Sequence, residues 1–187
     1  DENGFQFAKR SLQKLFPGVA VFFSGVNDYG VADEAIRHPI RGVFEKKQIS
    51  ENIELFNEIK SKGASIIIVG DASVTYEAIK SEINDQLLLH PEITAIYIES
   101  NKINQLLGTL KERDEKYLFL TTVGGIKDPT GRPLTLQQII TAIATATDAA
   151  IISMEDAYLF DGVLGGYVTS GVAQGQAAAR LAKRFIK

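Results

Sequence analysis

The sequence predicts an α/β protein built on parallel sheets. Short β-branched or aromatic runs alternate with amphipathic stretches of about ten to fifteen residues, which is the order typical of βα units. Several of these runs are apolar throughout, as strands covered on both faces should be. A chain of 187 residues with 45% hydrophobic residues can bury a substantial core. Its size lies between one large domain and two small lobes.

The expected elements follow in order along the chain. Strands are expected at Val19–Ser24, Arg41–Phe44, Ser65–Val69, Ile93–Ile98, Tyr117–Thr122, Ala149–Ser153 and Leu164–Thr169. Four amphipathic helices are marked by apolar stripes at 49, 53, 56 and 59, at 76, 79, 83 and 87, at 103, 106, 107 and 110, and at 136, 139, 140 and 143. Ser50 ahead of Glu54 and Thr75 ahead of Glu77 indicate helix starts. A long alanine-rich helix is expected to open at Ser170-Gly171.

Composition narrows the function classes. The 20 basic and 23 acidic residues are scattered and give a net charge of −3, so the sequence carries no electrostatic footprint for binding nucleic acid. Cysteine is absent, which excludes disulfides, thiolate catalysis and cysteine metal sites. With only two histidines, each followed by proline, no metal site is expected. No apolar run reaches the ~18 to 20 residues of a membrane span, and the start at Asp1 suggests a processed or excised chain.

Catalytic motifs are weak. No Gly-x-Ser-x-Gly occurs, and neither histidine lies near a serine in a nucleophile-elbow context. The turn at 69–73 follows a strand and precedes a helix, the topology of a nucleotide site, but it lacks the glycine spacing of a dinucleotide fingerprint and the lysine of a Walker motif. We therefore expect no enzymatic activity and no cofactor, with a nucleotide-using enzyme on a doubly wound sheet as the less favoured alternative.

Polar residues cluster just past the expected carboxyl ends of the strands, where open α/β sheets bind ligands. They are Asn27, Asp28, Asp71, Ser73, Glu99, Ser100, Thr121, Thr122, Glu155 and Asp156. Each alone is commonly a cap for the next helix. Together they predict one ligand-binding edge, the wall of a cleft. The glycine- and proline-rich segment 124–133 is expected to be a surface loop at the cleft rim that could act as a flap.

Three segments carry a family resemblance. The run 15–28, Leu-Phe-Pro-Gly-Val-Ala-Val-Phe-Phe-Ser-Gly-Val-Asn-Asp, resembles a Phe-Pro strand ending in Gly-Val-Asn-Asp, and 40–45, Ile-Arg-Gly-Val-Phe-Glu, resembles an Ile-x-Gly-Val crossover. The third is the terminal Gly-Gly-x-x-x-Ser-Gly-x-x-x-Gly helix entry. Together they are similar to the type I periplasmic-binding-protein fold, in the branch shared by solute-binding proteins of ABC transporters and the extracytoplasmic sensor regions of bacterial histidine kinases and GGDEF proteins.

The resemblance implies a two-lobed fold with parallel sheets flanked by helices. Residues 1–44 and 160–187 would form a first lobe that lacks its N-terminal part, and residues 45–159 a second lobe. A small solute would bind in the interlobe cleft. Asn27 and Asp28 match the first-lobe wall, and Asp156 with Tyr158 matches an aromatic-Asp-x-Tyr element at the hinge, which adds Tyr158 to the expected ligand-binding residues Asn27, Asp28, Asp71, Ser73, Thr121, Thr122 and Asp156.

The resemblance also implies partners. The favoured function is an extracytoplasmic sensor domain, with the membrane-anchored signalling region of the same protein as its partner. The alternative is a solute-binding protein that serves an ABC permease, and in both cases the location is periplasmic or otherwise extracytoplasmic. A homodimer is a further alternative. Two departures bear on the ligand: Glu155 stands where the family often has an aromatic residue, and Asp161 stands where it often has His. They disfavour a ligand stacked on a ring there and favour a cationic or hydrogen-bonding one.

Overall fold

The computed structural model describes residues 2–27, 40–61 and 63–186. It divides the chain into two compact units. Unit 1 comprises Asp1–Lys46 and Ser170–Lys187, and unit 2 comprises Lys47–Thr169. The chain therefore enters unit 2 after Lys46 and leaves it after Thr169.

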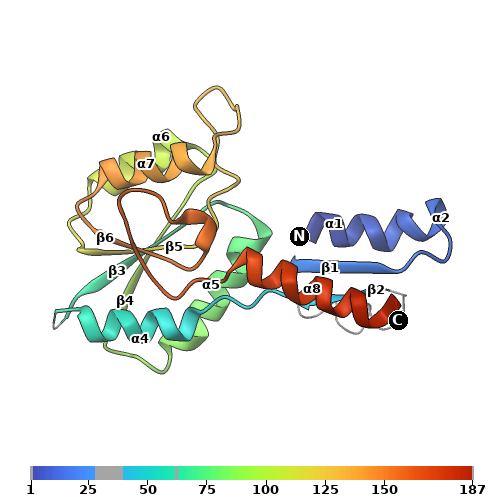
Figure 1. Ribbon diagram of the computed structural model, residues 1–187. Helices are drawn as coiled ribbons and strands as arrows, with labels where there is room; N and C mark the ends of the chain where they lie inside the picture. The colour runs from blue at the N-terminus through green and yellow to red at the C-terminus, as the bar shows by residue number, and fades with distance from the viewer. Residues whose placement is uncertain (1, 28–39, 62, 187) are drawn as a thin grey trace. The chain divides into compact units, whose positions relative to one another are not determined.

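Unit 2 is organised around a five-stranded parallel sheet (Figure 1). Its strands are β3 (Ser65–Gly70), β4 (Thr94–Glu99), β5 (Tyr117–Leu120), β6 (Ala150–Ser153) and β7 (Val163–Gly165), in the spatial order β4-β3-β5-β6-β7. The expected α/β class with parallel strands flanked by helices is confirmed. Because β3 pairs with β4 on one side and with β5 on the other, the direction of winding reverses between β3 and β5.

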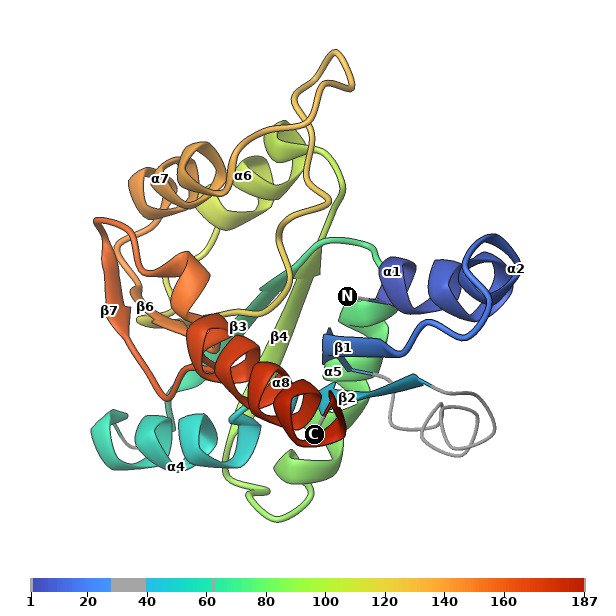
Figure 2. The ribbon, with the colours of Figure 1, turned by 45° about the vertical axis from the view of Figure 1, so that its right-hand side comes forward.

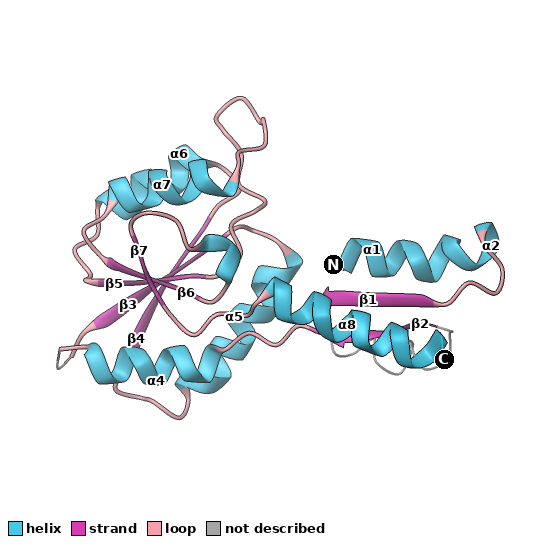
Figure 3. Ribbon diagram, viewed as in Figure 1, coloured by secondary structure: helices cyan, strands magenta, loops and turns pink. Residues whose placement is uncertain are grey.

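Helices cover both faces of this sheet (Figure 3). One face packs against α6 (Ile103–Lys111) and α7 (Leu136–Ala146), and the other packs against α4 (Ile49–Ile59) and α5 (Val74–Leu87). Figure 2 shows the same layers from a second direction.

The position of β3, covered by helices on both faces, explains why its sequence is apolar throughout. Ile67 and Val69 enter the core under α6 and α7, whereas Ile66 and Ile68 enter the core under α4 and α5. All four side chains are buried, because successive residues of a strand point to opposite faces. A parallel strand covered on both sides therefore has no polar face.

The helix caps differ from those expected at Ser50 and Thr75. Helix α5 is capped by Ser73, whose hydroxyl accepts a hydrogen bond from the Tyr76 N–H at 3.1 Å. Helix α4 starts at Ile49 without a side-chain cap bond. A reciprocal capping box opens α7, where Thr135 and Gln138 bond each other's backbone N–H groups. Ser73, which directly precedes the helix, therefore caps α5 in place of the expected Thr75.

Unit 1 contains a two-stranded parallel sheet of β1 (Val21–Val26) and β2 (Ile40–Phe44). Before it come α1 (Glu2–Phe7), the π-helical turn η1 (Ala8–Leu12) and α2 (Gln13–Leu15), and α8 (Gly171–Ile186) closes the chain. Phe5 of α1 contacts Phe23 edge-to-face at 5.1 Å, and Phe185 of α8 contacts Phe22 at 5.7 Å. Consecutive residues of β1 thus meet different helices, so α1 and α8 lie on opposite faces of this small sheet.

The second change of unit comes later than the expected boundary between residues 159 and 160. Strand β7 pairs with β6, which keeps residues 160–169 in unit 2. The strand is also shorter than the expected Leu164–Thr169, because Gly165 and Gly166 have φ values of +127° and +148° that end the ladder. Buried Asn52 then holds the backbone of Tyr167: its Nδ2 donates to the Tyr167 carbonyl at 2.7 Å, and its Oδ1 accepts from the Tyr167 N–H at 2.9 Å.

Candidate functional site

Asp71 lies at the centre of the carboxyl edge of the unit 2 sheet. It directly follows β3, is 3% exposed, and accepts hydrogen bonds at both carboxylate oxygens. Oδ1 accepts from the hydroxyls of Ser73 at 2.5 Å and Thr122 at 2.9 Å, and Oδ2 accepts from the Gly125 N–H at 2.7 Å. One buried carboxylate therefore fixes the start of α5 and the turn after β5.

This network lies where open α/β sheets place their ligands. Asp71 follows β3 and Thr122 follows β5, the two strands between which the winding reverses. The Asp71 N–H donates to the Thr122 carbonyl at 2.6 Å, so the two loops meet across the reversal. In doubly wound folds the crevice outside the carboxyl ends of such strands is the usual binding site.

Two residues at this edge were missed by the sequence reasoning. Asn101 follows β4, and its Oδ1 accepts from the Ala72 N–H at 3.0 Å. Gly125 approaches Asp71 so closely that a Cβ at that position would lie 2.8 Å from Oδ2. Asn101 is exposed. Asn101 comes directly after Ser100, just past the end of the expected strand Ile93–Ile98, and this position was the signal that could have found it.

Ser73, Thr121 and Thr122 differ in what remains available to a solute. The Ser73 hydroxyl both donates to Asp71 and accepts from Tyr76, so it supports the local structure. The Thr121 hydroxyl is buried and donates to the Val69 carbonyl at 2.8 Å. Thr122 is half-buried, and its oxygen retains accepting capacity after donating to Asp71. Their role in ligand binding stays a prediction, with Thr122 the best placed of the three.

Charged and aromatic side chains flank the site at the end of β4. The Lys80 ammonium bonds the Glu99 carboxylate at 3.0 Å and lies 5.5 Å and 5.3 Å from the ring centres of Tyr76 and Tyr97. Burial, followed by the nearby charge of Glu99, raises the pKa of the Tyr76 hydroxyl, and burial raises the pKa of Tyr97. Both phenols therefore stay neutral at physiological pH. Tyr76 is completely buried and the Tyr97 hydroxyl donates to Asn84 Oδ1 at 2.5 Å, so they support the local structure.

Asp156 and Tyr158 lie in a short 3₁₀ turn, η3 (Asp156–Tyr158), after β6. Tyr158 is 6% exposed and belongs to the core under α7, while Asp156 is half-buried. Glu155, where the resemblance leads one to expect an aromatic ring, forms a 2.6 Å ion pair with buried Lys47. The acidic residue that stands in place of the expected ring is thus paired with a cation 108 residues away in sequence.

The first-lobe candidates are Asn27 and Asp28. Asn27 follows β1 in unit 1 and is half-buried. Asp28 lies outside the described residues.

The expected flap is braced from within. The Asp128 carboxylate accepts from the N–H groups of Thr130 at 2.8 Å and Arg132 at 2.9 Å and from the Thr130 hydroxyl at 2.7 Å. These hydrogen bonds hold the pKa of Asp128 below its usual range. Backbone bonds from Lys127 to Asn101 and from Ile103 to Lys127 tie the base of the loop to the start of α6. The loop is therefore held in one turn at neutral pH.

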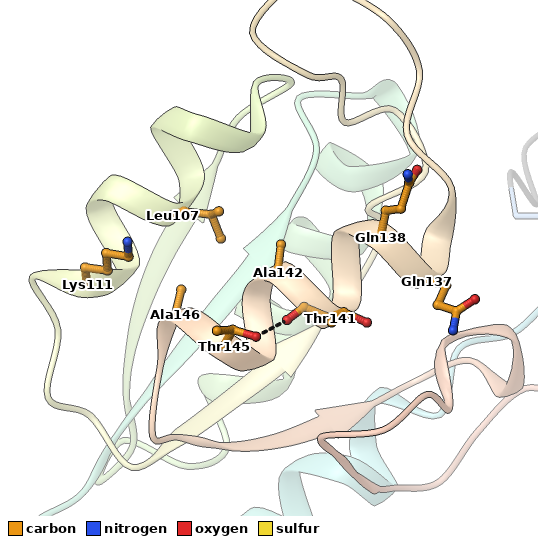
Figure 4. Close-up of a pocket in the computed structure, with 8 residues that line it drawn as sticks. All are labelled: Leu107, Lys111, Gln137, Gln138, Thr141, Ala142, Thr145 and Ala146. Atoms are coloured by element: carbon orange, nitrogen blue, oxygen red, sulfur yellow. Dashed lines mark hydrogen bonds between the residues drawn. The ribbon is translucent and has the colours of Figure 1, made fainter.

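A cavity of about 640 Å³ lies away from this edge, between α6 and α7 (Figure 4). Leu107 and Lys111 line it from α6, and Thr141 and Thr145 line it from α7. The Thr145 hydroxyl donates to its own helix, at the Thr141 carbonyl, 2.7 Å away. This cavity is a weaker candidate than the carboxyl edge because Lys111 is the one charged residue among those that line it.

Within residues 2–27, 40–61 and 63–186, no group of three or more His, Asp or Glu side chains is arranged to hold a metal ion. Among the same residues no helix combines the length and apolar character needed to cross a membrane.

Comparison with known proteins identifies the fold. No protein-family model matches the chain, and no curated protein matches it significantly. Among solved structures, the chain is similar to an ABC domain in complex with L-Trp from Streptococcus pneumoniae, with a TM-score of 0.68, 12% identity and 96% of this chain covered. It is also similar to a conserved domain protein from Vibrio cholerae O1 biovar El Tor, with a TM-score of 0.61, 15% identity and 95% coverage.

A third similar structure is an ABC transporter permease from the Pseudomonas fluorescens group, with a TM-score of 0.53, 14% identity and 86% of this chain covered. The chain spans 61% of the length of the first two structures and 41% of the third. At these identities the likeness establishes a shared α/β fold, consistent with the periplasmic-binding-like architecture that the sequence resembles.

Proposed function

We propose that this chain binds a small solute at the carboxyl edge of the unit 2 sheet, as the ligand-binding part of an extracytoplasmic sensor. The observation that carries the proposal is the Asp71 network at the winding reversal between β3 and β5. Asp71 is 3% exposed and accepts three hydrogen bonds, so its role is to hold Thr122 and the backbone of Gly125 in place rather than to touch the solute. The groups left facing solvent are on Thr122, Asn101 and Glu99.

The chemistry of this edge favours a solute that bears hydrogen-bonding groups or a cation. Glu99 is exposed and acidic, with Lys80 as its present cationic partner at 3.0 Å, and the amide of Asn101 can both donate and accept. The N-terminus of the fourteen-residue helix α5 lies at the same edge and favours a negative group nearby. A zwitterion such as an amino acid satisfies both preferences. The L-Trp bound by the Streptococcus pneumoniae structure makes L-tryptophan a reasonable first solute to test.

Binding proteins of this kind signal by population shift: a solute changes the equilibrium between two arrangements only by its difference in affinity for them. In a sensor, an attached signalling region would respond to that shift in the equilibrium. In a transport protein, an ABC permease would respond to it. The full gene and its neighbours distinguish a sensor from a transport protein. A membrane span followed by a kinase or GGDEF region supports sensing, and an adjacent permease gene supports transport.

The binding activity is tested by a thermal-shift screen of amino acids, nucleosides, sugars and carboxylates. A solute at ~100 times its dissociation constant stabilises the protein by about 2.7 kcal/mol, which is a readily visible shift. We expect at least one class to raise the melting temperature. The absence of a shift with all four classes would contradict solute binding by this chain.

Asp156 is expected to contribute to solute binding. In the Asp156→Ala variant the affinity should fall by more than about 1 kcal/mol, or roughly fivefold in Kd, because a partner on the solute loses a charge-assisted hydrogen bond. Isothermal titration with the solute found in the screen measures this change. Asp148→Ala is the matched control, since Asp148 is an exposed acidic residue that precedes β6, at the opposite edge of the sheet. Equal affinities of the two variants would remove Asp156 from the site.

A further inference from the structure

The ammonium group of Lys80 is surrounded by groups that attract cations. It lies 5.5 Å from the ring centre of Tyr76 and 5.3 Å from that of Tyr97, and it bonds the Glu99 carboxylate at 3.0 Å. Aromatic faces within about 6 Å of a cation attract it through the ring quadrupole, and a carboxylate adds its charge. We call Tyr76, Tyr97 and Glu99 the cation cage. Its members suit an ammonium group, whichever molecule supplies it.

The cation cage is held in place by contacts other than those with the ammonium group. The Tyr76 ring packs so tightly against Gly70 that no Cβ would fit at residue 70. The Tyr97 hydroxyl donates to Asn84 Oδ1 at 2.5 Å. Glu99 ends β4, in register with Gly70 of β3. The cage therefore keeps its shape when the lysine moves away, and such preorganisation favours binding.

Lys80 is the replaceable member of this arrangement. Its side chain is 27% exposed and that of Glu99 is 37% exposed, so solvent screens the ion pair between them. Partly exposed ion pairs contribute little to stability, and a lysine side chain turns about several rotatable bonds. A solute that places its own cation on Glu99 would therefore displace the ammonium group of Lys80 at little cost.

The cation cage borders the groups proposed to bind the solute. Gly70, on which the Tyr76 ring packs, directly precedes Asp71, and its carbonyl accepts from the Ser100 N–H at 3.2 Å. Glu99 comes two residues before Asn101, whose Oδ1 accepts from the Ala72 N–H. The ends of β3 and β4 are neighbours in the sheet, and adjacent strands lie about 5 Å apart. A solute of amino-acid size spans this distance.

We propose that the cation cage binds the cationic end of the solute and that Lys80 occupies the cage while no solute is bound. The inference rests on the proposed function, because it assigns part of the same edge. It narrows the solute class to amines and to cationic or zwitterionic amino acids, and it excludes sugars and carboxylates that carry no cation. Lys80 then lowers the apparent affinity in proportion to the fraction of protein whose cage it fills.

Amide chemical-shift titration with n-butylammonium, whose charged end matches that of lysine, tests the cage at constant ionic strength. 1-Butanol is the neutral control with the same carbon chain. We expect butylammonium, and not 1-butanol, to shift the backbone amides of Tyr97, Glu99 and residue 80. Lys80→Ala should lower the dissociation constant at least about fivefold, because it vacates the cage, and adding Glu99→Gln to that variant should raise it again by a similar factor.

Lys116→Ala is the matched control for the loss of a positive charge. Lys116 is an exposed lysine that directly precedes β5, at the opposite edge of the sheet, so its replacement should leave the dissociation constant of butylammonium at the wild-type value. Circular dichroism verifies that the variants fold, and Lys80→Gln takes the place of Lys80→Ala if the latter does not.

Three results of the titration would overturn the inference. They are equal dissociation constants for the wild type, Lys80→Ala and Lys116→Ala, equal binding of butylammonium and 1-butanol, and shifts centred away from the cage. The thermal screen separates this inference from the proposed function. A solute that stabilises the protein but carries no cation would overturn the cage and leave solute binding standing. A screen without any stabilising solute would contradict the proposed function and, with it, the role of the cage, even where butylammonium binds.

Discussion

Asn52→Ala is expected to lower the free energy of unfolding by about 3 kcal/mol. Asn52 is completely buried in the first turn of α4, and its amide makes three hydrogen bonds. Nδ2 donates to the carbonyls of Gln48 and Tyr167, both at 2.7 Å, and Oδ1 accepts from the Tyr167 N–H at 2.9 Å. Removing the amide leaves the Tyr167 N–H and carbonyl without these partners, at about 1 to 3 kcal/mol for each group, whereas the Gln48 carbonyl still accepts from the backbone N–H of residue 52.

The backbone path of the segment held by Asn52 also depends on Gly166. Gly166 has a φ of +148°, and a Cβ at that position would lie 2.4 Å from the Ser153 carbonyl oxygen and 2.8 Å from Asn52 Oδ1. The chain therefore passes close to β6 and α4 only because residue 166 is glycine and residue 52 is asparagine. This fixes the path by which the chain leaves β7.

Urea denaturation followed by circular dichroism measures the effect. Asn57→Ala is the control, because Asn57 is an exposed residue of the same helix, and its replacement should change stability by less than about 0.5 kcal/mol. If the two variants unfold at the same urea concentration, the hydrogen bonds of Asn52 contribute nothing and the anchoring role assigned to it is wrong.

Asp71→Ala is expected to cost about 3 kcal/mol of stability as well. The buried carboxylate accepts three hydrogen bonds, from Ser73, Thr122 and Gly125. Hydrogen bonds to a charged group contribute more than neutral ones, and their loss would free both loops at the carboxyl edge. A residue that only touched the solute would leave the stability of the solute-free protein almost unchanged, so this measurement separates a positioning role from a direct one.

Two further variants sharpen the result for Asp71. Asp71→Asn should lie between wild type and Asp71→Ala, because an amide oxygen can still accept from the two hydroxyls while its NH₂ group faces the Gly125 N–H. Asp85→Ala, at an exposed acidic residue of α5, is the control and should be close to neutral. Thermal unfolding without solute would contradict the positioning role if Asp71→Ala melted at the wild-type temperature.

Sequence patterns predicted most of unit 2 because its signals are local. The apolar stripe of α4 and the continuous apolar run of β3 each reflect the packing of a single element against the sheet. The carboxyl-edge argument also selected Asp71, Ser73 and Thr122 without knowing which strands are neighbours. The structure brings these three together because β5 pairs with β3 rather than with β4.

What the sequence did not reveal depends on partners distant along the chain. The Lys47–Glu155 pair joins residues 108 positions apart, and Asn52 meets a residue 115 positions away. No pattern within one element signals either contact. The predicted length of β7 was wrong for a related reason. The sequence Leu164–Thr169 is typical of a strand, and nothing in it signals that distant Asn52 anchors Tyr167.

The central claim is that the solute binds where β3 and β5 end, and amide chemical-shift mapping tests it most directly. The ¹⁵N-labelled chain is titrated with L-tryptophan and with each solute that stabilises the protein in the thermal screen. The account predicts that the largest shifts fall on Ala72, Asn101, Gly124 and Gly125, around the Asp71 network. Shifts centred instead on Leu107, Thr141 and Thr145, which line the α6–α7 cavity, would contradict it.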